Sequence, residues 1–99
     1  ITHRLNTKWG EPVDMDEFKA ALKKHGKIKA VLTQACETST ATVHPIQAMA
    51  KEVRATGDTL FLVDAITAAG CMPLPMDEWD IDVMVAGSQK AFMIPTGLS

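Results

Sequence analysis

Two short apolar runs separated by a helical pattern constrain the fold of this chain most. Residues 28–34 (IKAVLTQ) and 59–65 (TLFLVDA) read as strands, and the second is a continuous apolar run typical of a strand buried on both faces. Between them, the apolar residues of segment 46–53 recur at helical spacing, just after a proline suited to a first helical position. A strand, a helix and a second strand in this order favour a parallel sheet.

The flanking segments extend this alternation. We expect Asp14 to cap a helix, because its carboxylate can accept hydrogen bonds from the next turn, and Glu17 follows it as in a capping box. Apolar residues then recur at helical spacing as far as Gly26, which is expected to end the helix. Residues 80–87 (DIDVMVAG) predict a last strand, and residues 1–9 predict a short first one.

The predicted order is therefore strand, helix, strand, helix, strand, loop and strand. It indicates an α/β fold with a mostly parallel sheet and helices on both faces. Ligands bind to such sheets beyond the carboxyl ends of the strands. The polar residues expected there are Glu37, Thr38 and Ser39 in a polar loop over residues 36–45, Asp64 after the next strand, and Ser88, Gln89 and Lys90 after the last.

The composition argues against several classes of function. The chain has 99 residues, enough for one domain or part of one, and a net charge of −2 gives no electrostatic reason to expect nucleic acid or an anionic membrane. No apolar run approaches the roughly 20 residues that span a bilayer, and no signal-peptide pattern opens the chain. Cys36 and Cys71 lack metal-ligand spacing, so we expect reduced thiols, no metal and a cytoplasmic location.

Asp64 and Lys90 are charged residues next to apolar strands. A carboxylate at the end of a buried strand is costly to desolvate unless it is paired, so Asp64 could cap the next turn, form a salt bridge or face a cation in the crevice. Lys90 stands between VMVAGSQ and AFMIP, and its neighbours are expected to be buried, although a lysine at a strand end can also be purely structural. An amine in a dry pocket is a usable nucleophile that forms Schiff bases with carbonyl groups.

Together, the two residues are more informative than either one alone. Pyridoxal phosphate chemistry needs a lysine that joins the cofactor aldehyde and an acidic partner that keeps the ring nitrogen protonated. Asp64 and Lys90 follow successive main strands, 26 positions apart (90 − 64). Both are expected at the same edge of the sheet, where they can face one flat ring.

Three stretches of sequence carry a family resemblance. They are ETSTATVHP from Glu37, the run from LFLVDAITAAG to GSQKAF, and the segment PTGLS. With them the chain resembles class V aminotransferases of pyridoxal-phosphate fold type I, and within these the alanine–glyoxylate or serine–pyruvate aminotransferase group. The resemblance covers nearly the whole chain and implies that residues 1–99 are the central part of a large cofactor-binding domain.

The resemblance also implies roles for single residues. Lys90 matches the lysine that joins the cofactor, and Asp64 matches the aspartate paired with its ring nitrogen. Gln89 matches a residue that contacts the cofactor near its phosphate, and Ser88 is expected beside it. Thr38 stands at the position of a hydroxyl near the 3-oxygen of the ring, with Ser39 as the second choice.

Some features depart from the family or are missing. Family members often have glycine where this chain has Ala41, and this difference affects the turn after ETST. The related cysteine desulfurases usually have histidine where this chain has Gln89, so Gln89 favours an aminotransferase. The glycine-rich phosphate loop, the aromatic residue that stacks on the ring and the arginine that binds the substrate carboxylate have no match in this segment. We therefore expect a homodimeric parent enzyme that acts on amino acids and 2-oxo acids, and an isolated segment that is inactive.

Other functions remain open from the residues alone. A receiver-like signalling domain could use Asp64 as a phosphoacceptor, but it would need an acidic pair near Trp9, where none is present. A Ser-Lys hydrolase could use Ser88 with Lys90. Another class V member, such as a cysteine desulfurase or a lyase, would keep the cofactor and change the reaction.

Overall fold

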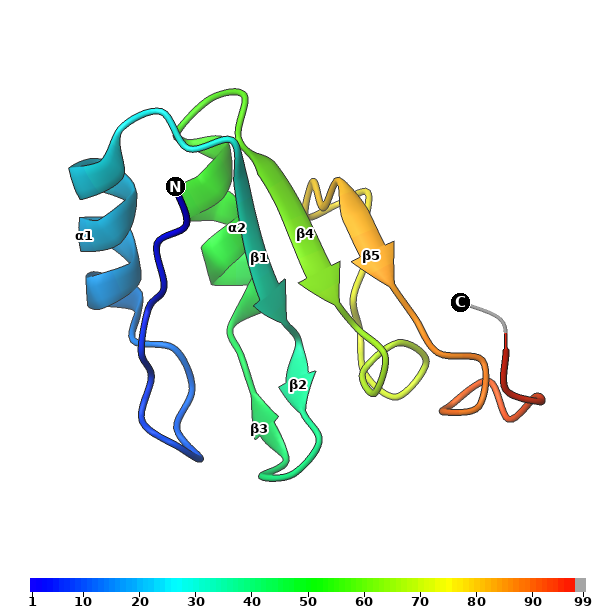
Figure 1. Cartoon of the computed structure of the whole chain (residues 1–99). Coiled ribbons are helices and arrows are strands. Elements are labelled where there is room, and N and C mark those ends of the chain that lie inside the picture. The colour runs from blue at the N-terminus through cyan, green and yellow to red at the C-terminus, as the bar shows by residue number, and fades with distance from the viewer. Residues whose placement is uncertain (98–99) are drawn as a thin grey trace.

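The computed structural model describes residues 1–97, and its centre is a three-stranded parallel sheet in the order β1-β4-β5 (Figure 1). A separate two-stranded antiparallel hairpin, β2-β3, follows β1. The elements in chain order are α1 (Met15–His25), β1 (Ala30–Gln34), β2 (Cys36–Glu37), β3 (Thr42–Val43), α2 (Ile46–Arg54), β4 (Leu60–Asp64) and β5 (Val83–Val85). The α/β class with a parallel sheet is confirmed.

Both helices begin where the sequence predicts. Asp14 caps α1, because its Oδ1 accepts hydrogen bonds from the backbone amides of Asp16 (2.8 Å) and Glu17 (2.9 Å). Gly26 ends α1 with a φ of 64°, a conformation that glycine adopts without steric cost. Pro45 precedes α2, where its missing amide hydrogen is not needed by the helix.

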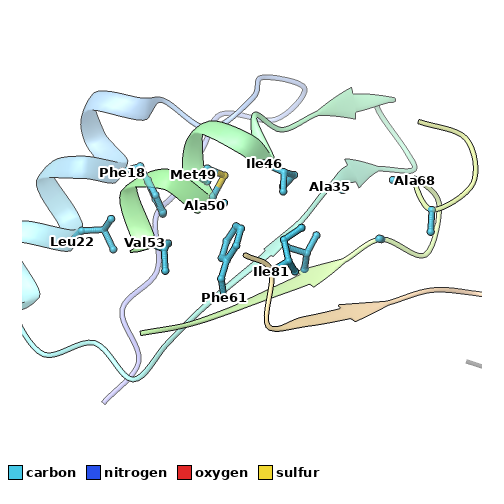
Figure 2. Close-up of a cluster of buried hydrophobic side chains, with 13 residues drawn as sticks. Phe18, Leu22, Ala35, Ile46, Met49, Ala50, Val53, Phe61, Ala68 and Ile81 are labelled. Carbon is cyan, nitrogen blue, oxygen red and sulfur yellow. The ribbon is translucent and has the colours of Figure 1, made fainter. Parts of the chain in front are cut away.

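The core lies between the two helices and one face of the sheet (Figure 2). Phe18 and Leu22 of α1 and four residues of α2 pack towards Phe61 and Val63 of β4. Phe61, Val53 and Val63 are the largest of the fully buried side chains. The α2 residues are Ile46, Met49, Ala50 and Val53.

The opposite face of the sheet differs from the expectation of helices on both faces. Helices α1 and α2 pack on the same side, since α1 contacts α2 and both contribute to one core cluster. The residues that alternate with Phe61 and Val63 therefore lie on the open face, where Leu62 is half-buried and other apolar residues of the sheet are exposed. These exposed residues are Leu32 of β1, Leu60 of β4, and Val83 and Val85 of β5.

Asp82 ties the short β5 strand to its neighbours. Its Oδ2 accepts a hydrogen bond from the Phe61 backbone amide (2.6 Å) and an ion-paired hydrogen bond from Arg54 of α2. The Phe61 hydrogen bond, ahead of the Arg54 pair, lowers the pKa of the Asp82 carboxyl. The residue directly before β5 is thereby attached to both β4 and α2.

Two predictions about local structure are wrong. Residues 1–9 form no strand, because they pair with no strand among residues 1–97. They run beside α1, and Leu5 packs against the core (Figure 1). The predicted polar loop over residues 36–45 contains the β2-β3 hairpin, whose turn places Ala41 at a φ of 55°.

No helix among residues 1–97 has the length and apolar character needed to cross a membrane.

Candidate functional site

The carboxyl ends of the three parallel strands meet at one edge. Gln34, the last residue of β1, is in register with Asp64 at the end of β4, and Asp64 is in register with Val85 at the end of β5. The three arrows in Figure 1 point the same way, and both the β2-β3 hairpin and the segment after β5 leave the sheet from that edge. The candidate residues after these strands therefore share one edge of the sheet.

Asp64 is exposed at the middle of this edge, on the face away from the helices. Phe61 and Val63 are buried against the helices, so strand alternation directs Asp64 to the open face. Its Oδ1 accepts a hydrogen bond from the Ile66 backbone amide at 3.0 Å, which fixes the carboxylate over the following turn. This contact is the turn cap expected of a structural carboxylate, and it engages one of the two oxygen atoms.

Lys90 lies in a hydrogen-bonded turn after β5. The amide of Lys90 donates to Gly87 O (3.3 Å), and the amide of Met93 donates to Lys90 O (3.0 Å). Ser88 closes the segment with two hydrogen bonds. Its backbone carbonyl accepts one from the Ile94 amide (3.2 Å), and its Oγ donates one to the Pro95 carbonyl (2.8 Å). Ser88 is buried and its hydroxyl proton is engaged, which does not suit the nucleophile of a Ser-Lys hydrolase.

The expectation of buried neighbours around Lys90 is confirmed for Gly87 and Ser88 before it and is wrong for the apolar residues after it. Lys90 is exposed, and so are Phe92 (52%), Met93 (88%) and Ile94 (48%). The segment that carries them follows β5 beyond the edge of the sheet, away from α1 and α2 (Figure 1). A dry environment for the amine is therefore not supplied by residues 1–97.

Gly87 lets the lysine segment fold back onto the edge. A Cβ atom at this position would lie 3.0 Å from Ile66 Cγ2, 3.3 Å from Gln89 Oε1 and 3.6 Å from Lys90 Cγ. The side chains of Ile66, Gln89 and Lys90 thus gather closely around Gly87, next to the turn that Asp64 caps. Gly87 has no site role among the sequence predictions, although a glycine at the end of an apolar strand is a recognisable signal of close approach.

Thr38 and Ser39 are exposed in the turn of the hairpin that follows β1. Ser39 donates from its amide (2.9 Å) and its Oγ (2.7 Å) to Glu37 Oε1, and Gln34 Nε2 donates to Glu37 Oε2 (2.7 Å). These hydrogen bonds, that of the Ser39 hydroxyl first, lower the pKa of the Glu37 carboxyl to about 2. Glu37 is consequently ionised over the whole physiological pH range and holds the turn to the strand end.

Two hollows border the molecule in different places. A hollow of about 90 Å³ is lined by Gln34, Glu37 and His44 and by residues 7–11. Burial, partly offset by the charge of Glu37, lowers the pKa of His44, whose Nδ1 accepts a hydrogen bond from the Val13 amide (3.1 Å). A larger hollow of about 530 Å³ lies between α2 and residues 78–80, away from the strand ends that carry the candidate residues.

Comparison with known proteins decides the family. The model of the family described as "Aminotransferase class-V" matches residues 3–99. The chain belongs to the class V aminotransferases. The resemblance stated from the sequence is thereby confirmed, as is the fold class.

Relatives of this class V chain are several times longer than it is. It is 43% identical over 100 residues to the soluble hydrogenase small subunit of a Synechococcus strain, covering 99% of this chain and 26% of that protein. It is 37% identical over 97 residues to the (S)-ureidoglycine–glyoxylate transaminase of Bacillus subtilis, covering 98% and 23%. The crystal structure of alanine–glyoxylate aminotransferase from Nostoc matches with a TM-score of 0.85 and 30% identity, covering 94% and 24%. The class V chain thus spans about a quarter of the length of these relatives.

Proposed function

We propose that this chain is the central part of the cofactor-binding large domain of a pyridoxal-phosphate-dependent aminotransferase. The observation that carries the proposal is the shared edge, where Asp64 ends the middle strand and the Lys90 segment folds back across Gly87. Membership of the class V family and similarity to transaminases named for glyoxylate support the same reaction. The parent enzyme would transfer an amino group from an amino acid such as alanine or serine to a 2-oxo acid such as glyoxylate or pyruvate.

The residues at this edge fit a planar cofactor with an aldehyde, a ring nitrogen and a phosphate. Gly87 lets the side chains of Gln89 and Lys90 pack close to Ile66, in the turn after Asp64, so that the amine segment and the carboxylate turn lie against each other. Asp64 offers an exposed carboxylate that is already oriented by Ile66 N, and Lys90 offers the amine. When bound, pyridoxal phosphate supplies an aldehyde that joins amines and a cationic ring that takes up electron density from the substrate.

Each residue has a defined task in this proposal. Lys90 Nζ would hold the cofactor covalently and, once released, would take and return the proton of the substrate's alpha carbon. Asp64 would keep a proton on the ring nitrogen by charge pairing. Gln89 and Ser88 would hold the segment beside the phosphate, and the hydroxyl of Thr38 or Ser39 would hydrogen-bond the 3-oxygen of the ring.

Water exclusion is the task that this chain does not perform by itself. Lys90 is exposed, and so are the apolar residues Phe92, Met93 and Ile94. Exposed apolar side chains beside a reactive amine form a surface that another part of the protein can cover. The rest of the parent chain or a second subunit of a homodimer would provide this cover. Residues 1–99 alone are accordingly proposed to lack transaminase activity.

Reductive trapping tests the proposal. Full-length protein is incubated with pyridoxal phosphate, reduced with borohydride, digested and mapped by mass spectrometry. We expect the reduced adduct on Lys90 in the wild-type protein and its loss in Lys90→Ala, while Lys24→Ala, a change at an exposed helical lysine, keeps it. An adduct on another lysine, or none, in folded wild-type protein refutes the proposal.

A further inference from the structure

Glu37 joins two parts of the candidate site through its carboxylate. Oε2 accepts from the Gln34 side chain at the end of β1, and Oε1 accepts twice from Ser39 in the turn of the hairpin. Gln34 is the register partner of Asp64 on the neighbouring strand. A continuous chain of contacts therefore runs from the turn that carries Thr38, through Glu37 and Gln34, to the strand position beside Asp64.

The same contacts distinguish the two hydroxyl groups of the turn. The Ser39 Oγ proton is directed at Glu37 Oε1 at 2.7 Å, so this hydroxyl is engaged as a donor within the protein. Thr38 lies between Glu37 and Ser39 in the chain and is exposed. Because Glu37 binds the residue on the far side of Thr38, the backbone of Thr38 is held from both sides.

We propose that Glu37 is a positioning residue, which fixes the turn of Thr38 relative to Asp64 so that the Thr38 hydroxyl, and not that of Ser39, meets the cofactor ring. This inference rests on the proposed function and adds a residue that acts through others. Glu37 itself makes its hydrogen bonds to Gln34 and Ser39 and needs no contact with the ligand. Its three hydrogen bonds to a charged acceptor are of the stronger kind, which suits a fixed geometry.

The test compares variants of the full-length protein by two readouts. One is the dissociation constant for pyridoxal phosphate, and the other is the unfolding midpoint of the cofactor-free protein. Glu37→Ala is expected to weaken cofactor binding by about tenfold, the effect of one charge-assisted hydrogen bond, in cofactor-free protein that the unfolding midpoint shows to be folded at the assay temperature. Glu37→Gln keeps the shape and an acceptor oxygen, and it should recover part of the affinity.

Further variants separate positioning from general stability. Gln34→Ala removes the other half of the link and should reproduce the loss, and Thr38→Ala should weaken binding more than Ser39→Ala. Glu78→Gln, at an exposed glutamate away from the strand ends, should bind the cofactor as the wild type does. If Glu37→Ala fails to fold, Glu37→Gln and Gln34→Ala provide the comparison.

The outcomes are distinguishable from failure of the proposed function. Wild-type protein that binds no pyridoxal phosphate overturns both proposals. Wild-type protein labelled at Lys90, together with Glu37 and Gln34 variants of unchanged affinity, overturns the positioning role alone. A larger effect of Ser39→Ala than of Thr38→Ala on cofactor affinity also overturns it.

Discussion

Gly70 supports the segment that bears Lys90, and replacing it by alanine would test this packing. Its φ of 85° lies in the left-handed region, and a Cβ atom would lie 2.9 Å from Ala91 Cβ, next to Lys90 in the chain. Gly57 has a similar φ of 96°, but a Cβ there would meet no atom within 4 Å. The two glycines therefore share the backbone effect and differ in the steric one.

The magnitude follows from these two effects. A non-glycine residue in the left-handed region costs about 1–2 kcal/mol, which applies to both Gly70→Ala and Gly57→Ala. A contact of 2.9 Å between two Cβ atoms forces the backbone to shift, and overpacking of this kind costs about 1–3 kcal/mol more. We therefore expect Gly70→Ala to lower the free energy of unfolding by about 1–3 kcal/mol more than Gly57→Ala does.

Denaturant unfolding of the full-length, cofactor-free protein measures this difference without a contribution from ligand binding. Borohydride trapping provides a second readout, since displacement of Ala91 should lower the adduct on Lys90 in Gly70→Ala but not in Gly57→Ala. Equal stability of the two variants, with equal trapping, would refute the close contact between the turn after β4 and the lysine segment.

The remaining predictions concern the helix cap, the hairpin turn and acid stability. Asp14→Ala should lower stability by about 1 kcal/mol in thermal unfolding, because Asp14 Oδ1 accepts two backbone amides of α1, whereas Glu11→Ala, upstream of the helix, should have a much smaller effect. Ala41→Gly should raise stability by up to about 1 kcal/mol, since Ala41 has a φ of 55°; a destabilised Ala41→Gly protein would contradict the assigned turn. Folding lowers the pKa of the Glu37 carboxyl from 4.5 to about 2. The contribution of this carboxylate to stability is therefore complete above pH 4.5 and is lost as the pH falls towards 2. Glu37→Gln should reduce this acid dependence in unfolding experiments between pH 2 and pH 6.

The helices and main strands follow from local sequence. Asp14 and Gly26 mark the limits of α1 because capping and left-handed backbone need only neighbouring residues. The apolar runs around β1 and β4 predict parallel strands, and parallel strands bring their carboxyl ends to one edge whatever the details of packing. The shared edge of Asp64 and Lys90 was therefore predictable from the sequence.

Contacts between distant residues decided the rest. Whether residues 1–9 form a strand depends on a partner strand, and whether Lys90 is buried depends on which surfaces cover it. The roles of Gly87, which faces Ile66 Cγ2, and of the Glu37 carboxylate, which holds Gln34 and Ser39, became visible only in the folded chain. Local propensity specifies the elements because it acts within a few residues, whereas burial and side-chain hydrogen bonds depend on atoms that only the tertiary fold brings together.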